Sequence, residues 1–280
     1  AHTKKGHGVS IWDDNPKSHG SWGPSDSDFS LAKNELEISA DLIKSHKFKQ
    51  NTSLQKYSPT IKFLEDRKEN SVVLPPSESF TEYTFQNDKL ISLREAFGKA
   101  ISNLAVKYKN FDLFDADVKG GTLTQIFERH FPDRFIQCGI AEQNMISAAA
   151  GYYLASGRLP IVTTYAVFTS LLCAAQFRNG VVMQKLPFII ASSHIGIDTG
   201  PDGPTHQAIE DIGIFSTFPG VQVLGPSDAN KLQSCLESAI ISKKPTYIRT
   251  GRSPLPIINP ENMTYEIGKD DVLIEGTDVS

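Results

Sequence analysis

Residues 135–164 read FIQCGIAEQNMISAAAGYYLASGRLPIVTT, and this stretch decides the fold. A short apolar run at 135–139 is followed by a segment of helical length at 141–156 and by a second apolar run at 160–164. Gly157 stands between the helical segment and the second run, at a position where glycine commonly ends a helix. A strand, a helix and a strand in this order predict a βαβ unit with parallel strands.

The same alternation continues on both sides of this unit. Ser92 and Glu95 form a capping pattern that predicts a helix starting after Ser92. Further strands are expected at 111–117, 187–192, 221–225 and 246–250, and further helices near 122–131, 166–180, 207–217 and 228–242. The sequence therefore predicts an α/β fold, with an open, mostly parallel six-stranded sheet and helices on both faces. Ligands of such sheets bind at the carboxyl ends of the strands, so the residues after the strands are the functional candidates.

The chain divides into four parts. Residues 1–30 are rich in His, Gly, Ser, Asp and Pro and predict an irregular arm, while 31–89 predict one or two surface helices and a linker. The alternating pattern occupies 90–257, and 258–280 are expected to be a linker toward a further domain. Since both ends look cut, we expect a piece of a larger protein or one subunit of a split protein.

Composition excludes several classes of function. The 280 residues include 28 Lys or Arg and 32 Asp or Glu, so the net charge is −4 and nucleic acid is not an expected partner. No apolar run approaches the ~18–20 residues of a membrane helix, so no membrane partner is expected. Cys138, Cys173 and Cys235 are scattered, which argues against disulfides or a zinc site and favours a reducing, cytoplasmic location.

Glu142 follows a predicted strand and lies in the first turn of a predicted helix. The free amides and the dipole of a helix N-terminus favour a carboxylate there. Because the helix behind it is apolar, this carboxyl group could have a perturbed pKa and do acid–base chemistry. The simpler interpretation, a charge that only stabilises the helix, stays open.

A Gly- and Pro-rich loop at 192–207 follows another predicted strand and holds His194, Asp198, Asp202 and His206. Long loops with this density of polar groups are typical of binding sites. The spacing of the histidines is a weak metal pattern, and hydrogen bonding to a hydroxyl-rich ligand or proton transfer fits as well. His206 could instead only begin a helix.

Three further groups follow predicted strands. Tyr165 and Phe168 share a helix face and would either stack on a flat ring or pack in the core. Arg252 lies in a turn and is either a phosphate clamp or an ordinary surface arginine. Asp115 and Asp117 are two residues apart and are expected to project to one side of a strand, which is thin support for a metal site.

In order and spacing, residues 135–145, the helix with Tyr165 and Phe168, and GPDGPTHQ at 200–207 resemble the pyrimidine-binding domain of transketolases. The resemblance covers residues 90–257 and implies the thiamine-diphosphate-binding fold of the pyrimidine type. Residues 2–20 resemble the end of the family's pyrophosphate-binding domain.

The resemblance implies transfer of a two-carbon ketol unit from a ketose phosphate to an aldose phosphate through a thiamine diphosphate ylide. Glu142 matches the glutamate that bonds the aminopyrimidine and drives its tautomer change. Tyr165 and Phe168 match aromatic residues around the pyrimidine, and Asp117 is also assigned to the cofactor.

The resemblance also assigns the substrate channel. It makes His19, His194 and His206 catalytic and substrate-binding, gives Asp202 a sugar hydroxyl, and makes Arg94 and Arg252 the sugar-phosphate arginines.

Several positions depart from the family pattern. The phosphate-site serine is missing from 117–122, where Lys119 or Thr122 could compensate. Leu171 replaces an expected tyrosine, and Pro201 stands where many relatives have glutamate.

The family's motif for the metal and the diphosphate is absent from this chain. The resemblance therefore implies that Mg²⁺ (or Ca²⁺) and the diphosphate are held by a domain outside it, and no metal ligand is expected within it. A homodimer, or a second subunit with the missing domain, is the implied partner, and the chain alone is expected to be an incomplete catalyst.

Other functions stay open at this point. They are a dihydroxyacetone or deoxyxylulose phosphate synthase, a non-catalytic subunit or scaffold, and the beta subunit of a 2-oxo acid dehydrogenase. The sequence Arg249-Thr250-Gly251-Arg252 favours transketolase, and the histidines and arginines argue against the dehydrogenase subunit.

Overall fold

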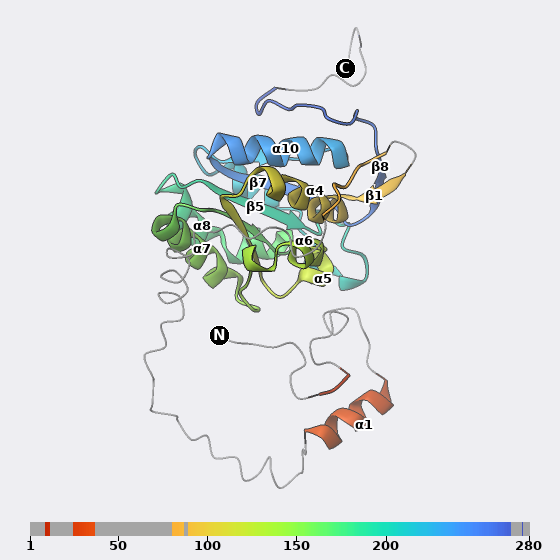
Figure 1. The fold of residues 1–280 in the computed structure, drawn as a ribbon. Coiled ribbons are helices and arrows are strands. Elements are labelled where there is room, and N and C mark those ends of the chain that lie inside the picture. Colours follow the sequence, from red (N-terminus) through yellow and green to blue (C-terminus); the bar gives the residue numbers. More distant parts are fainter. Residues whose placement is uncertain (1–8, 12–24, 37–79, 87–88, 270–275, 277–280) are drawn as a thin grey trace.

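The computed structural model describes residues 9–11, 25–36, 80–86, 89–269 and 276. At its centre is a six-stranded sheet with the strand order β3-β2-β4-β5-β7-β6 (Figure 1). The strands are β2 (Phe111–Asp115), β3 (Phe135–Gln137), β4 (Leu159–Thr163), β5 (Phe188–Ser193), β6 (Gln222–Leu224) and β7 (Pro245–Thr250). Every neighbouring pair in this sheet is parallel, which confirms the predicted α/β fold.

Helices cover both faces of the sheet. One face carries α4 (Leu93–Lys107), α6 (Gln125–His130) and α10 (Ala229–Ser242), and the other carries α7 (Glu142–Ser156), α8 (Ala174–Phe177) and α9 (Asp211–Ser216). Ile161 packs in the core under α4 and α10, whereas Val162 packs in the core under α7 and α8. This alternation follows from the two-residue period of a strand, and burial of both faces explains why the strands are continuous apolar runs. No helix within these ranges is both long and apolar enough to cross a membrane.

Some boundaries differ from those that the sequence predicts. The strand expected at 111–117 ends at Asp115, because Asp117 takes a left-handed backbone with φ 64°. The expected pair of carboxylates on one side of a strand is therefore wrong. Ser92 caps α4 by accepting from the Glu95 amide at 3.3 Å, but the Glu95 carboxylate bonds Lys99 Nζ at 2.7 Å, so the second half of the capping box is missing.

Three predicted helices are interrupted. The one at 166–180 becomes α8 flanked by π-helical turns, η3 (Phe168–Leu172) and η4 (Arg178–Val182). The one at 122–131 becomes α5 (Lys119–Thr122) and α6, and a short 3₁₀ turn, η2 (Pro132–Arg134), follows α6. The one at 207–217 is shortened to α9, because 207–210 are not helical, and two 3₁₀ turns, η5 (Gly200–Asp202) and η6 (Pro204–His206), precede it. Hydrophobic periodicity locates a helix but does not register such breaks.

A small antiparallel pair of strands is absent from the sequence prediction. β1 (Leu90–Ser92) pairs with β8 (Pro254–Pro256), and prolines at both ends of β8 hide its strand character. The pair matters for function, because it brings the segment after Arg252 beside the start of α4, where Arg94 lies.

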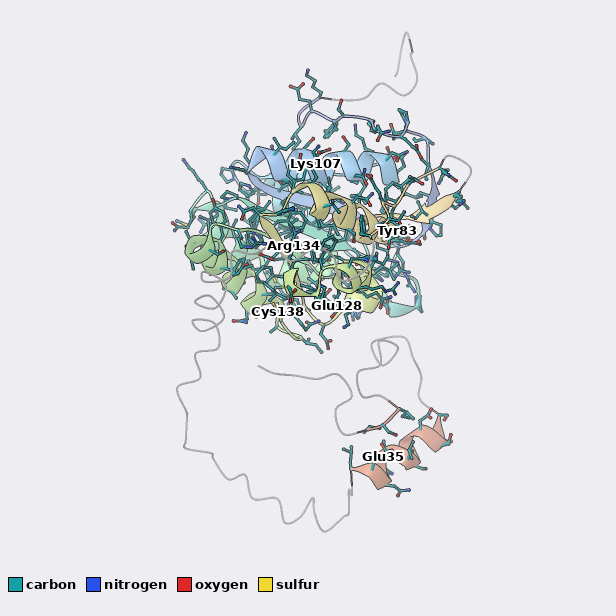
Figure 2. The ribbon with its side chains drawn as sticks, viewed as in Figure 1. Glu35, Tyr83, Lys107, Glu128, Arg134 and Cys138 are labelled. Atoms are coloured by element: carbon teal, nitrogen blue, oxygen red, sulfur yellow. The ribbon has the colours of Figure 1, made fainter. Side chains whose placement is uncertain are left out.

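Two segments before the sheet also correct the prediction. A helix, α1 (Asp26–Glu35), begins at a capping box between Ser25 and Asp28, so the last residues of the expected irregular arm are helical, whereas 31–35 lie in the segment where a surface helix is predicted. Within the expected linker, Phe85 is buried in the core. Tyr83, which Figure 2 labels, bonds Asn103 on α4 and His130 on α6. The other residues of 1–79 that we assigned lie outside the described ranges.

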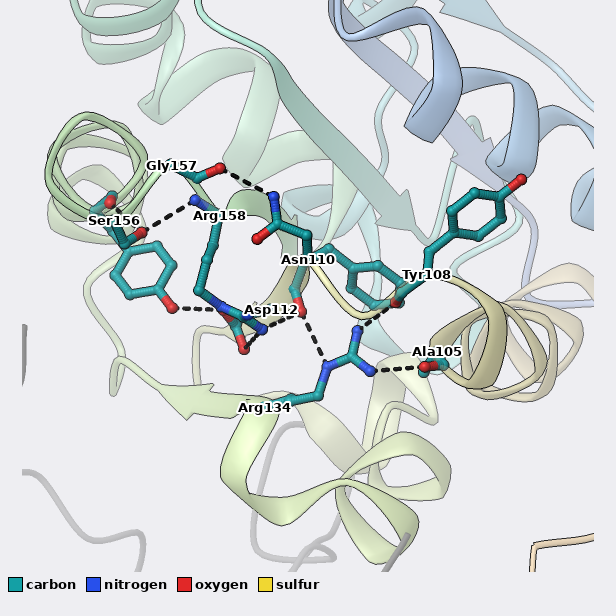
Figure 3. A network of polar contacts seen from close by, with 10 residues as sticks. Ala105, Tyr108, Asn110, Asp112, Arg134, Ser156, Gly157 and Arg158 are labelled. Carbon is teal, nitrogen blue, oxygen red and sulfur yellow. Dashed lines mark hydrogen bonds and ion pairs between the residues drawn. The ribbon is translucent and has the colours of Figure 1, made fainter. Parts of the chain in front are cut away.

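Buried charged side chains connect the segments at the amino-terminal ends of the strands (Figure 3). Arg134, 6% exposed, donates to the carbonyls of Phe111, Ala105 and Tyr108 at 3.0, 2.8 and 2.9 Å. Next to it, Arg158 pairs with the fully buried Asp112 at 2.5 Å. These groups lie at the end of the sheet opposite to the loops discussed below, so their role is to hold the fold.

We expect Arg134→Lys to lower the free energy of unfolding by about 2–4 kcal/mol, because one ammonium group cannot satisfy three carbonyls held by a planar guanidinium. Urea denaturation measures the change. Arg178→Lys, at an exposed position on η4, is the control and should stay within about 0.5 kcal/mol of the parent. Equal effects of the two substitutions would contradict the assigned role.

Candidate active site

The carboxyl ends of β2, β4 and β5 meet where the strand order reverses. From β2 the chain moves outward to β3 and then crosses back to β4 and β5. A reversal of this kind leaves a crevice at the carboxyl edge of the sheet, where α/β proteins bind ligands. Tyr165 extends β4 through a bridge to Ser193 at the end of β5, so the two loops start side by side.

Two aromatic rings and two imidazoles form one cluster at this edge. The ring centroids of Tyr165 and His194 lie 4.0 Å apart. Tyr165 also stacks on Phe168, with 5.9 Å between the ring centroids. His206 meets Phe168 edge to face at 5.3 Å. The structure thus brings together four residues that the sequence singled out, and Phe168 and His206 keep part of their surface open. Burial raises the pKa of Tyr165 to about 12, so its phenol stays protonated.

His194 is held in an unusual state. Its backbone has φ 59°, its side chain is 1% exposed, and Nδ1 shares a hydrogen bond with Ser193 Oγ at 2.9 Å. Burial and the charges of Arg94 and Arg252 lower its pKa to about 3. Nε2 lies 3.7 Å from Asp202 Oδ2. A neutral imidazole can accept one hydrogen bond and donate another, which suits recognition of hydroxyl groups.

Arg94 and Arg252 approach each other from different elements. The Arg94 amide donates to the Gly251 carbonyl at 3.1 Å, which joins the start of α4 to the turn after β7. Burial, and next the charge of Arg252, lower the pKa of Arg94. Arg94 Nη1 donates to Gly121 O at 2.8 Å, whereas its buried Nε has no hydrogen-bond partner in the described part of the chain. Two adjacent guanidinium groups with donors to spare suit an anion such as a phosphate.

The side chain missing at position 121 leaves room for a ring. A Cβ built on Gly121 would lie 2.1 Å from the hydroxyl oxygen of Tyr165, so the phenol occupies that space. Both residues named as substitutes for the phosphate-site serine already have protein partners. Lys119 bonds Glu128 at 3.0 Å, and the Thr122 hydroxyl is buried against Asp115.

Glu142 begins α7 on the neighbouring side of the crevice and is 9% exposed. The next residue, Gln143, donates from Nε2 to Leu172 O at 3.0 Å, which ties the start of α7 to η3. Burial and the charge of Glu142 raise the pKa of Cys173 to about 12. Among the described residues the Glu142 carboxylate makes no hydrogen bond or ion pair, which leaves it available to a ligand.

Asp115 and Asp117 have separate roles. Asp115 is fully buried, and burial raises its pKa to about 6 although Val118, Thr122 and Thr124 donate hydrogen bonds to it. The Asp117 amide donates to Gln137 Oε1 at 2.8 Å, and the side chain of Gln137 also contacts Asp115. Asp115 is therefore a structural acid that shapes the end of β2.

The structure collects most of the residues assigned from the sequence. It places Arg94, Tyr165, Phe168, His194, Asp202, His206 and Arg252 together, with Glu142 on the adjoining helix and Asp117 at the end of β2. His19 lies outside the described residues. Within these ranges, no group of three or more His, Cys, Asp or Glu side chains is placed to hold a metal ion. Sequence reasoning missed the roles of Gly121 and Gln137, which leave no periodic signal.

Comparisons with known proteins agree on one family. A family model described as transketolase, pyrimidine binding domain, matches residues 89–257. A relative described as a transketolase C-terminal section, from Methanocaldococcus jannaschii, is 36% identical over 190 residues, which cover 67% of this chain and 60% of the relative. Transketolase from Mus musculus is 30% identical over 278 residues, which cover 99% of this chain and 42% of the relative. The chain thus spans well under two thirds of these relatives.

Solved structures give the same result. A split gene transketolase, described as an inactive β4 tetramer, is 36% identical with a TM-score of 0.60, and the match covers 66% of this chain and 60% of that one. Transketolase from Campylobacter jejuni, at 21% identity and a TM-score of 0.57, shares the fold; the match covers 84% of this chain and 33% of that one.

The state of His194 leads to a pH-dependent stability. Because its folded pKa lies below that of an unfolded histidine, the unfolded chain takes up the extra proton and His194 lowers stability as the pH falls from about 7 toward 4. We expect His194→Asn, which tolerates the left-handed backbone, to remove this slope. Over this pH range, the free energy of unfolding of the parent should therefore fall by roughly 2–4 kcal/mol more than that of the variant. Urea titrations at each pH measure both. Parallel curves for the parent and the variant would contradict the neutral state.

Proposed function

The chain belongs to the transketolase family through its pyrimidine-binding domain, and on this premise we propose that it forms part of a thiamine-diphosphate-dependent site for ketol transfer between sugar phosphates. One observation carries the proposal. Glu142 is a buried carboxylate at a helix start, without a hydrogen-bond or ion-pair partner among the described residues, and its helix adjoins η3, which carries Phe168 of the cluster of aromatic rings and imidazoles.

The residues present fit the aminopyrimidine half of the cofactor. A buried acid that lacks a partner can bond a ring nitrogen, and the half-buried Phe168 offers an apolar face to a flat ring. When bound, thiamine diphosphate supplies the nucleophilic carbon and the electron sink for cleaving the bond beside a ketose carbonyl. Glu142 would hold a proton at the ring nitrogen, and the aromatic cluster would exclude water from the crevice. We also propose that Asp117 contacts the cofactor.

The loop after β5 and the two arginines would bind the sugar. The neutral His194 and the half-exposed His206 would hold or move protons at sugar hydroxyls, together with Asp202. Arg94 and Arg252 would bind the terminal phosphate through their paired donors. We propose that His19 joins this channel.

In this proposal, a second domain is needed to complete the site. We propose that a pyrophosphate-binding domain of a partner subunit, a second copy or a separate chain, holds the diphosphate and its Mg²⁺ or Ca²⁺. The relatives support this, since one is described as a C-terminal section and another as an inactive tetramer of a split gene product. In this proposal residues 1–30 end such a domain, 31–89 connect to the unit at 90–257, and 258–280 lead toward a C-terminal domain. A cytoplasmic location stays a prediction.

Substitution of Glu142 tests the cofactor assignment. In the complete protein with its partner domain, thiamine diphosphate and Mg²⁺, we expect Glu142→Gln to slow ketol transfer between pentose phosphates by roughly 10²–10⁴-fold, because the amide cannot hold the ring proton. Hydrogen–deuterium exchange at the reactive carbon of the cofactor, followed by NMR, should slow in parallel while the cofactor still binds.

Glu210→Gln, at an exposed position, is the matched control and should leave both readouts unchanged. Normal exchange in Glu142→Gln would remove the assigned role. Cofactor binding without ketol transfer in the parent would leave a scaffold or one of the related synthases.

Arg252 tests the phosphate assignment. We expect Arg252→Ala to raise KM for a phosphorylated ketose about 10–100-fold, because a charge-assisted contact with the phosphate is lost. KM for the same sugar without its phosphate should rise much less. An equal rise for both sugars would show that Arg252 does not read the phosphate.

A further inference from the structure

The turn that carries Arg252 is fastened to the loop after β5 by one carboxylate. Asp198 Oδ2 accepts from the backbone amides of Arg252 and Ser253, at 2.8 Å each, and Asp198 Oδ1 accepts from the Ser253 hydroxyl. Asp198 lies midway between His194 and Asp202, and Arg252 follows it by 54 residues. One side chain thus fixes two segments of the crevice to each other.

The guanidinium of Arg252 returns to the same loop. Its Nη1 donates to the Thr199 carbonyl and lies 3.5 Å from Asp202 Oδ2. Gly200, with φ +65°, makes this return possible, because a Cβ there would lie 2.7 Å from Nη1. The backbone of Arg252 is held by Asp198 and its guanidinium by the Thr199 carbonyl. These contacts restrict the directions in which the remaining N–H groups of the guanidinium can point.

Asp198 keeps its charge in this arrangement. Burial opposes ionisation, but the hydrogen bonds from Ser253 and Arg252 outweigh it and lower the pKa of Asp198. All three of these hydrogen bonds lie in the turn, so its carboxylate orients residues rather than reacting with a ligand. Its negative charge also offsets part of the repulsion between Arg94 and Arg252, which otherwise disfavours the pair.

We propose that Asp198 is a positioning residue, which holds the turn at 252–253 so that the guanidinium of Arg252 stays beside that of Arg94 and thereby sets the preference for phosphorylated over unphosphorylated sugars. This inference rests on the proposed function, since it requires that the paired arginines bind a phosphate. A mere loop tie would instead affect all substrates equally.

The test compares substitutions at both ends of this contact, and at a neighbouring control position, in the complete protein. Asp198→Ala removes all three acceptor contacts, Asp198→Asn keeps the shape but removes the charge, and Ser253→Ala removes only the hydroxyl donor. We expect Asp198→Ala to raise KM for a phosphorylated aldose roughly 5–20-fold, with kcat and the KM for the unphosphorylated aldose within about twofold of the parent. Asp198→Asn and Ser253→Ala should shift the same KM in the same direction by less. Ile197→Ala, at an adjacent side chain that is 75% exposed, is the matched control and should change nothing.

A binding measurement separates this inference from the proposed function. Inorganic phosphate is titrated into the protein, and the Arg94 and Arg252 side-chain signals are followed by NMR. If Arg252→Ala does not weaken phosphate binding, the phosphate assignment itself fails. If Arg252→Ala weakens it but Asp198→Ala does not, only the positioning role is overturned. If Asp198→Ala fails to fold, unchanged phosphate binding and KM in both Asp198→Asn and Ser253→Ala would overturn the role.

Discussion

Because β2, β4, β5 and β7 are parallel, the loops that follow them all lie at the carboxyl ends of the strands. The candidate site depends on this constraint. Four separate segments reach that edge only because their strands run in the same direction. The amino-terminal ends of the strands are closed by the Arg158–Asp112 ion pair and by Arg134, whereas the carboxyl ends keep polar atoms that lack partners among the described residues. The amino-terminal ends of the strands therefore stabilise the fold, and the carboxyl ends are available to a ligand.

The electrostatics of the site balance cations against neutral and acidic groups. Arg94 and Arg252 stand close enough to disfavour each other, and they help to keep His194 uncharged. Asp198 and Asp202 offset part of the repulsion between the two arginines, and Arg94 Nε has no hydrogen-bond partner among the described residues. A dianionic ligand would relieve this repulsion, whereas a neutral sugar would not.

How much of this the sequence could predict depends on the range of each interaction. The strands were predictable because burial on both faces leaves apolar runs such as that at 159–163, and glycine and proline mark their ends. The site residues were predictable where they lie in dense motifs after strands, as His194 and Glu142 do. Asp198 lies in the same dense loop, but its bonds to the turn at 252–253 gave no signal, because these partners lie 54 and 55 residues away and such hydrogen bonds have no period. The left-handed turn at Asp117 escaped for a related reason, since that turn depends on a bond from its amide to Gln137.

The contact between Gly121 and Tyr165 links the evolution of two positions on different loops. A phenol that fills the volume above one α-carbon forbids a side chain there, so Gly121 cannot change alone without displacing a ring that also touches an imidazole. The space near the guanidinium groups therefore depends on residues 121 and 165 together, although they are distant in the sequence.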